Sequence, residues 1–112
     1  MLDKKDKGRL IQIINHCKRI VDITKNISNK EFADSIDIQE IVCFNIFQIG
    51  ELAKGLSNQL IQSDNQTPWK QIKGMRDIIG HGYGTINIET VWETVVVDVP
   101  KLLNHCIKLN SD

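Results

Sequence analysis

The chain has 112 residues, of which 41% are apolar and 25% are charged, close to the average of folded proteins, and this composition excludes disordered and fibrous classes. Equal numbers of acidic and basic residues give a formal net charge of zero, which argues against a DNA-binding protein that relies on bulk positive charge. The length suffices for one modest hydrophobic core, so we expect a single domain over residues 1–112.

The three cysteines, Cys17, Cys43 and Cys106, lie far apart within apolar segments. We expect them to be reduced, partly buried thiols of a cytoplasmic protein. The first ten residues include basic side chains but no following apolar segment, so we expect no signal peptide. No run of residues approaches the ~20 apolar residues that a membrane span needs, so we expect no membrane association.

Apolar residues at intervals of three and four predict an amphipathic helix from about residue 6 to residue 26. Its inward face is expected to hold Leu10, Ile13, Ile14, Cys17, Val21 and Thr24. A turn-rich interval follows. Within it, Ser28 and Glu31 have the spacing of a capping box, which predicts a short helix through Phe32.

A second long helix is predicted from Asp37, with Glu40 as its capping-box partner, to about Gln62. Its inward stripe comprises Ile38, Ile41, Val42, Asn45, Ile49, Leu52, Ala53, Leu56 and Leu60. The first three turns are apolar nearly all round because they also contain Cys43, Phe44, Ile46 and Phe47. Such a helix must be covered on both sides, so we interpret its second face as a homodimer interface. The alternative is the central helix of a monomer.

Thr67 and Pro68 predict the start of a further short helix, with Thr67 as the N-cap and Pro68 in the first helical position. Asn87 is expected to cap a last helix whose apolar face extends to Leu109. Pro100 should kink this helix, because proline removes one hydrogen bond and crowds the carbonyl four residues back. The elements together predict an all-α protein, an antiparallel helical bundle with a kinked C-terminal helix.

The segment at residues 75–84, MRDIIGHGYG, contains the best candidates for chemistry, Arg76, His81 and Tyr83, among three glycines. A guanidinium stays charged and offers a planar fork of donors, so it can stabilise phosphate charge that grows in a transition state. Histidine exchanges protons near neutral pH. Tyr83 could contact a phosphate or base, or carry a modification. The structural alternatives are a surface Arg76 paired with Asp77 and a half-buried Tyr83 that closes the bundle.

Helix geometry limits whether Arg76 and His81 can lie in the same site. Five residues of unbroken helix turn a side chain by about 500°, which leaves Arg76 and His81 about 140° apart. The two side chains converge only if the helix ends near Gly80 or if a second subunit supplies part of the site.

Two further sets of residues are candidates for support or RNA contact. The basic set comprises Lys54, Lys70 and Lys73, although scattered lysines usually form a solvated face. The polar set, which interrupts the most apolar helix, comprises Asn45, Gln48 and Glu51. A buried amide or carboxylate needs a partner, so the polar set either braces the motif or holds the dimer in register. The Asn-His-Cys triplets at 15–17 and 104–106 lack any supporting carboxylate spacing, so we expect no metal and no cofactor.

The pattern of Arg76, four residues, His81, one residue and Tyr83 resembles the signature of HepT-like proteins of the HEPN superfamily. These are small helical ribonuclease toxins encoded beside a minimal nucleotidyltransferase antitoxin of the MntA type. The segments NIFQIGEL at 45–52, Pro68-Trp69 and IETVWETVVVDVP at 88–100 look like family landmarks in the same order. The resemblance covers nearly the whole chain. It implies a bundle of four to five helices that dimerises, with the two motifs meeting in a cleft at the dimer interface.

The resemblance also implies metal-independent RNA cleavage in a type VII-like toxin–antitoxin pair. Arg76 would stabilise the charge on phosphorus, and His81 would act as general acid and base while the ribose 2′-hydroxyl attacks. Tyr83 would be the residue that the MntA-like partner adenylylates to silence the toxin. Asp77 departs from the pattern, because relatives often carry Asn there and a carboxylate would partly neutralise Arg76. The alternatives are a non-catalytic nucleotide-binding or substrate-binding companion of the transferase, and a purely structural helical adaptor.

Overall fold

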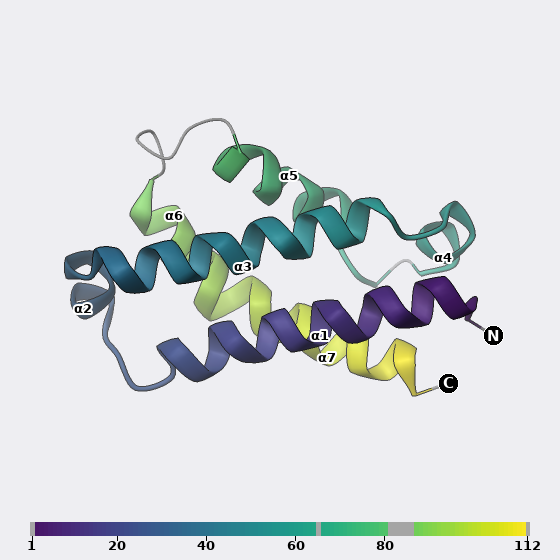
Figure 1. The fold of residues 1–112 in the computed structure, drawn as a ribbon, viewed down its shortest axis with the longest axis horizontal. Coiled ribbons are helices and arrows are strands. Elements are labelled where there is room, and N and C mark those ends of the chain that lie inside the picture. The colour runs from purple at the N-terminus through teal and green to yellow at the C-terminus, as the bar shows by residue number, and fades with distance from the viewer. Residues whose placement is uncertain (1, 65, 81–86, 112) are drawn as a thin grey trace.

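The computed structural model describes residues 2–64, 66–80 and 87–111, which form helices that alternate in direction along one axis (Figure 1). The longer helices are α1 (Lys4–Thr24), α3 (Ile36–Lys54), α5 (Trp69–Gly80) and α7 (Val99–Asn110). The shorter ones are α2 (Asn29–Asp34), α4 (Asn58–Ser63) and α6 (Ile88–Glu93). Helix α3 packs between α1 and α5, and α7 packs against α1. No strand occurs in these ranges, which confirms the predicted antiparallel all-α bundle.

The core is built from aliphatic side chains of α1, α3 and α7. Its fully buried members include Leu10, Ile13, Cys17, Ile20, Val42, Ile46, Ile49, Val99, Leu102 and Cys106. The predicted stripe of α1 is correct except at its end, where Ile20 is fully buried and Val21 is only half-buried. Burial raises the pKa of Cys17 to about 12 and that of Cys43 to about 11, so these thiols stay protonated and unreactive. All three cysteines are buried, more deeply than the sequence indicated.

Helix α2 is fixed by the predicted capping box. The Ser28 hydroxyl accepts from the Glu31 backbone N–H at 3.1 Å, and the Glu31 carboxylate accepts from the Ser28 N–H at 3.0 Å. Phe32 is fully buried, and its ring centroid lies 5.1 Å from that of Trp92. This aromatic pair anchors the α2 turn against α6.

The predicted second helix is wrong at both ends. Its N-cap is Ser35, whose hydroxyl accepts from the Ile38 N–H at 3.2 Å, so the helix begins at Ile36 and not at Asp37. Its end comes at Lys54, where Gly55 forms the C-cap. Ser57 then caps the separate helix α4, which carries the apolar spacing on to Ser63. The stripe continues across the turn because Leu56 and Leu60 still face the core.

The all-round apolar character of α3 is largely explained within one chain. Cys43 and Ile46, which we assigned to a dimer face, are 1% exposed, because α3 lies between α1 and α5 with α2 beside it. Ile41, which we assigned to the inward stripe, is 44% exposed instead. Phe44 is 58% exposed. The large apolar side chains of α3 that remain exposed are therefore Ile36, Ile41 and Phe44.

The last predicted helix is interrupted, as expected from Pro100. Asn87 caps α6 by accepting from the Thr90 N–H at 3.2 Å, as predicted. A π-helical segment, η2 (Thr94–Asp98), then joins α6 to α7. Proline in the next turn donates no hydrogen bond and crowds the carbonyl of Val96, and a wider turn relieves that crowding. The expected kink therefore takes the form of a π-helical segment.

A buried carboxylate joins the first turn of α1 to the start of α4. Asp6 is 3% exposed, and its two oxygens accept from the Ser57 backbone N–H at 2.9 Å and from the Ser57 hydroxyl at 2.5 Å. Ser57 also caps α4, so one carboxylate orders both chain segments.

Replacing Asp6 by alanine is expected to lower the free energy of unfolding by about 2 kcal/mol, because two buried donors lose a charged acceptor. Urea denaturation measures the change. Asp3→Ala is the matched control, since Asp3 is exposed one turn earlier and its side chain makes no capping bond. Equal effects of the two substitutions would contradict the assignment.

Candidate functional site

Arg76 lies in the last turns of α5, and its side chain reaches across to α3. Its Nε donates to the Oε1 of Glu51 at 2.5 Å. The side chains of Arg76 and Glu51 are 33% and 37% exposed, so the ion pair is partly desolvated but remains in contact with solvent. Glu51 was predicted to support the motif, and the structure places it directly on Arg76.

An aromatic ring lies beneath the same guanidinium. The central carbon of the Arg76 guanidinium is 5.5 Å from the ring centroid of Phe47, within the range of a cation–π interaction. Phe47 is half-buried, and it precedes Glu51 by one helical turn on α3. From the sequence alone, Phe47 belongs only to the apolar surplus of this helix.

Gly50 allows the two helices to come this close. A Cβ at Gly50 would lie 2.2 Å from the Cβ of Arg76 and 3.3 Å from its Cα. No side chain fits there unless α5 moves, because the clash is with atoms that cannot rotate away. Phe47, Gly50 and Glu51 lie at positions i, i+3 and i+4, on one face of α3. We call these three residues the Arg76 cradle.

Asn45 has different partners. Its side chain is 3% exposed and donates to the Ile41 carbonyl at 2.8 Å. Its Oδ1 lies 2.7 Å from the Nδ1 of His16, and since the amide nitrogen is committed to Ile41, the imidazole donates. Asn45 therefore ties α3 to α1, whereas Glu51 ties α3 to α5.

The basic candidates lie on two helices, α3 and α5. Lys73 is half-buried on α5, three residues before Arg76, which places the two on neighbouring positions of one helix face. Lys70 is exposed one turn earlier, and Lys54 is exposed at the C-terminal end of α3.

The remaining candidates follow Arg76 along the chain. Helix α5 is described from Trp69 to Gly80, and it begins one residue later than predicted. The Pro68 carbonyl accepts from the Ile72 N–H, so Pro68 occupies the N-cap position. His81 and Tyr83, together with the side chain of Asp77, lie outside the described part of the structure.

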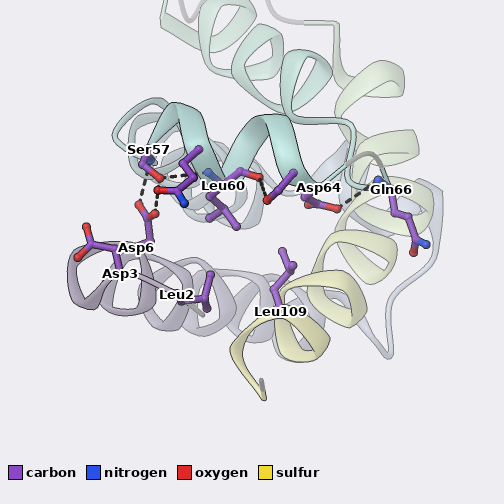
Figure 2. A pocket seen from close by; sticks show the side chains of 10 residues that line it. Leu2, Asp3, Asp6, Ser57, Leu60, Asp64, Gln66 and Leu109 are labelled. Atoms are coloured by element: carbon purple, nitrogen blue, oxygen red, sulfur yellow. Dashed lines mark hydrogen bonds between the residues drawn. The ribbon is translucent and has the colours of Figure 1, made fainter.

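A cavity of about 500 Å³ lies at the end of the bundle that holds both termini, and no residue of the Arg76 cradle is among those that line it (Figures 1 and 2). Its walls come from the start of α1, from α4 and from the end of α7. Two of its carboxylates already have partners. Asp6 binds Ser57, and Asp64 accepts from the indole N–H of Trp69 at 3.0 Å.

Within residues 2–64, 66–80 and 87–111, no group of three or more His, Cys, Asp or Glu side chains is placed to hold a metal ion. No helix of these ranges is both long and apolar enough to cross a bilayer.

Comparison with known proteins gives concordant matches. The chain matches the family model "Ribonuclease HepT-like" over residues 13–109, which includes the cradle and the segment from Arg76 to Tyr83. It is 34% identical over 112 residues to "Putative RNase MJ0127" of Methanocaldococcus jannaschii, covering 99% of this chain and 93% of the relative. It is 29% identical over 99 residues to "Putative RNase TTE0752" of Caldanaerobacter subterraneus subsp. tengcongensis, covering 88% of each.

"Probable ribonuclease HepT" of Thermococcus cleftensis is 27% identical over 110 residues, which cover 98% of this chain and all of the relative. No solved structure matches the chain.

Proposed function

Since the chain belongs to the HepT-like ribonuclease family, we propose that it is an endoribonuclease toxin whose chemistry centres on Arg76 and His81. The observation that carries this proposal is the Arg76 cradle. It holds a permanent cation at the end of α5, immediately before the segment that contains His81 and Tyr83. A fixed guanidinium in a partly desolvated position suits the stabilisation of a phosphodiester as charge develops on it.

The proposed reaction is transesterification within the RNA strand. The 2′-hydroxyl oxygen bonds to the adjacent phosphorus as the bond from phosphorus to the 5′-oxygen breaks. One imidazole accepts the hydroxyl proton and another donates a proton to the leaving oxygen. The products are a 2′,3′-cyclic phosphate and a free 5′-hydroxyl. Arg76 supplies the positive charge, so the scheme requires no metal ion.

A homodimer would supply the second imidazole. Ile41 and Phe44 are exposed on α3, and Phe44 lies one turn before Phe47 of the cradle. A second copy seated on this row would cover exposed apolar surface on the helix that carries the cradle. The exposed apolar row therefore supports a dimer.

We further propose that Tyr83 is the regulatory residue and that a cytoplasmic MntA-like nucleotidyltransferase adenylylates it, as in a type VII-like toxin–antitoxin pair. Tyr83 follows Arg76 by seven residues. An attached AMP would add bulk and negative charge to the segment that follows Arg76, and a bound anion there would oppose the binding of RNA phosphate.

Co-expression with such a transferase is expected to add mass in units of AMP to the intact protein. The gain should disappear in Tyr83→Phe, because phenylalanine has no hydroxyl to modify. Mass spectrometry of the intact chain measures both results. A mass gain that persists in Tyr83→Phe would reject Tyr83 as the acceptor.

One observation favours the second candidate function, a non-catalytic companion that binds nucleotide or substrate for the transferase. A carboxylate, Glu51, is already bound to the guanidinium, and Asp77 follows Arg76 in the sequence. Such a protein would bind RNA or nucleotide without turnover. Incubation of the purified protein with RNA distinguishes the two candidates, because only the toxin generates cyclic-phosphate ends.

A further inference from the structure

We propose that Glu51 is the positioning residue of Arg76, and that together with Phe47 and Gly50 it fixes the guanidinium plane before RNA binds. This inference rests on the proposed ribonuclease function. It assigns to α3 a role in catalysis that acts through Arg76, without contact between Glu51 and the reacting atoms.

Two contacts with α3 hold the guanidinium of Arg76. The Glu51 carboxylate accepts from Nε, and the central guanidinium carbon lies over the Phe47 ring, 5.5 Å from its centroid. A planar, rigid group held by a hydrogen bond and by a ring contact has less freedom to rotate about the last side-chain bonds. Paired hydrogen bonds to a phosphate require the guanidinium plane to be aimed at the phosphate, so this orientation matters for binding the transition state.

Gly50 lets α3 and α5 come close enough for Glu51 and Phe47 to reach the Arg76 guanidinium. Because a Cβ at this position would overlap the Cβ of Arg76, the glycine brings the α3 backbone to the base of the arginine side chain. Glu51, the next residue, therefore accepts a hydrogen bond from Nε, the guanidinium nitrogen nearest the backbone. The i, i+3, i+4 spacing of the cradle thus places a ring, a gap and a carboxylate around one guanidinium.

Glu51 could instead compete with RNA for Arg76, and the two roles predict opposite effects of removing its charge. If its carboxylate competed with RNA for Arg76, removal of its charge would tighten RNA binding and speed cleavage. If it orients Arg76, removal slows the chemical step and changes RNA affinity little, since misplacement of a reacting group affects the transition state more than the bound ground state.

Single-turnover cleavage of RNA by the full-length protein separates these roles. We expect Glu51→Gln to slow cleavage at saturating RNA by roughly 10- to 100-fold, with the RNA dissociation constant changed less than about twofold. Glu51→Asp should recover part of the loss, because it restores a carboxylate. The matched control is Glu40→Gln, which changes an exposed carboxylate on the same helix and should cleave at the wild-type rate.

A second readout is independent of nuclease activity. The chain has three arginines, so the Nε–H signals of protein labelled with 15N-arginine are few, and the Arg76 signal is identified by its loss in Arg76→Lys. We expect this signal to shift in Glu51→Gln and to stay in place in Glu40→Gln.

An unmoved Arg76 signal in Glu51→Gln, or cleavage by that variant at the wild-type rate or faster, would overturn the positioning role. A shifted signal in a protein that cleaves no RNA would support the positioning of Arg76 and reject the proposed function instead. The two failures are therefore distinguishable.

Discussion

Arg76→Ala is expected to reduce RNA cleavage by about a thousandfold while the helices stay folded. The guanidinium carries the permanent positive charge that the proposed reaction places against the phosphate, and removal of such a group typically costs two to three orders of magnitude or more. The measurement is single-turnover cleavage, with far-ultraviolet circular dichroism to establish that the helical content is unchanged.

Two further variants test whether the loss of cleavage is specific to the guanidinium of Arg76. Arg19→Ala removes an exposed arginine of α1 and should cleave at the wild-type rate. Arg76→Lys retains the charge but lacks both the planar fork and the Nε that binds Glu51, so it should remain severely impaired. Wild-type cleavage by Arg76→Ala would exclude Arg76 from the reaction.

Gly50→Ala is expected to lower the free energy of unfolding by about 3 kcal/mol, the upper range for overpacking in a close-packed contact. The added methyl would lie 2.2 Å from the Cβ of Arg76, so α3 and α5 must separate. The separation would also pull Glu51 from Nε, and cleavage should fall with stability. Urea denaturation and single-turnover cleavage measure the two effects.

Gly8→Ala is a control with the opposite sign. Gly8 is helical, and a Cβ there meets nothing within 4 Å. Alanine should therefore raise the stability by about 0.5 to 1 kcal/mol through its higher helix propensity. If Gly50→Ala were as stable as Gly8→Ala, the close approach of α3 and α5 at Arg76 would be wrong.

The local signals in the sequence predicted much of the fold. Ser28 with Glu31, and also Asn87, mark a helix start by chemistry that operates within four residues, and the structure has a helix start at both places. Pro100 likewise predicts an interruption, because its steric effect reaches only the preceding turn.

The break between α3 and α4 could not be found from apolar spacing. Leu56 and Leu60 continue the stripe of Leu52 and Ala53 at helical intervals, although a turn separates them. Apolar periodicity shows which residues face the core. Two helices that pack on the same core keep this periodicity across the turn between them. Gly55 followed by Ser57 was the available signal, a C-cap residue before an N-cap residue.

The sequence predicted only part of the candidate site, because local patterns do not show which distant residues come into contact. Arg76 was found because a motif surrounds it, but its pairing with Glu51 joins residues 25 positions apart and depends on how α3 and α5 pack. Phe47 was assigned to the apolar surplus because sequence cannot distinguish a ring that covers a partner chain from one beneath a guanidinium. The isolated Gly50 within an apolar helix was the available signal, since such a glycine often marks a close approach.

The most direct test of the proposed reaction uses one RNA in two forms, with and without a 2′-deoxy substitution at the cleaved nucleotide. Each is incubated with purified protein in the presence of EDTA. We expect the all-RNA strand to be cleaved to a 2′,3′-cyclic phosphate at a rate that the chelator does not reduce, and the substituted strand not to be cleaved at that position. Equal cleavage of both strands, or cleavage of the all-RNA strand that requires a metal ion, would contradict it.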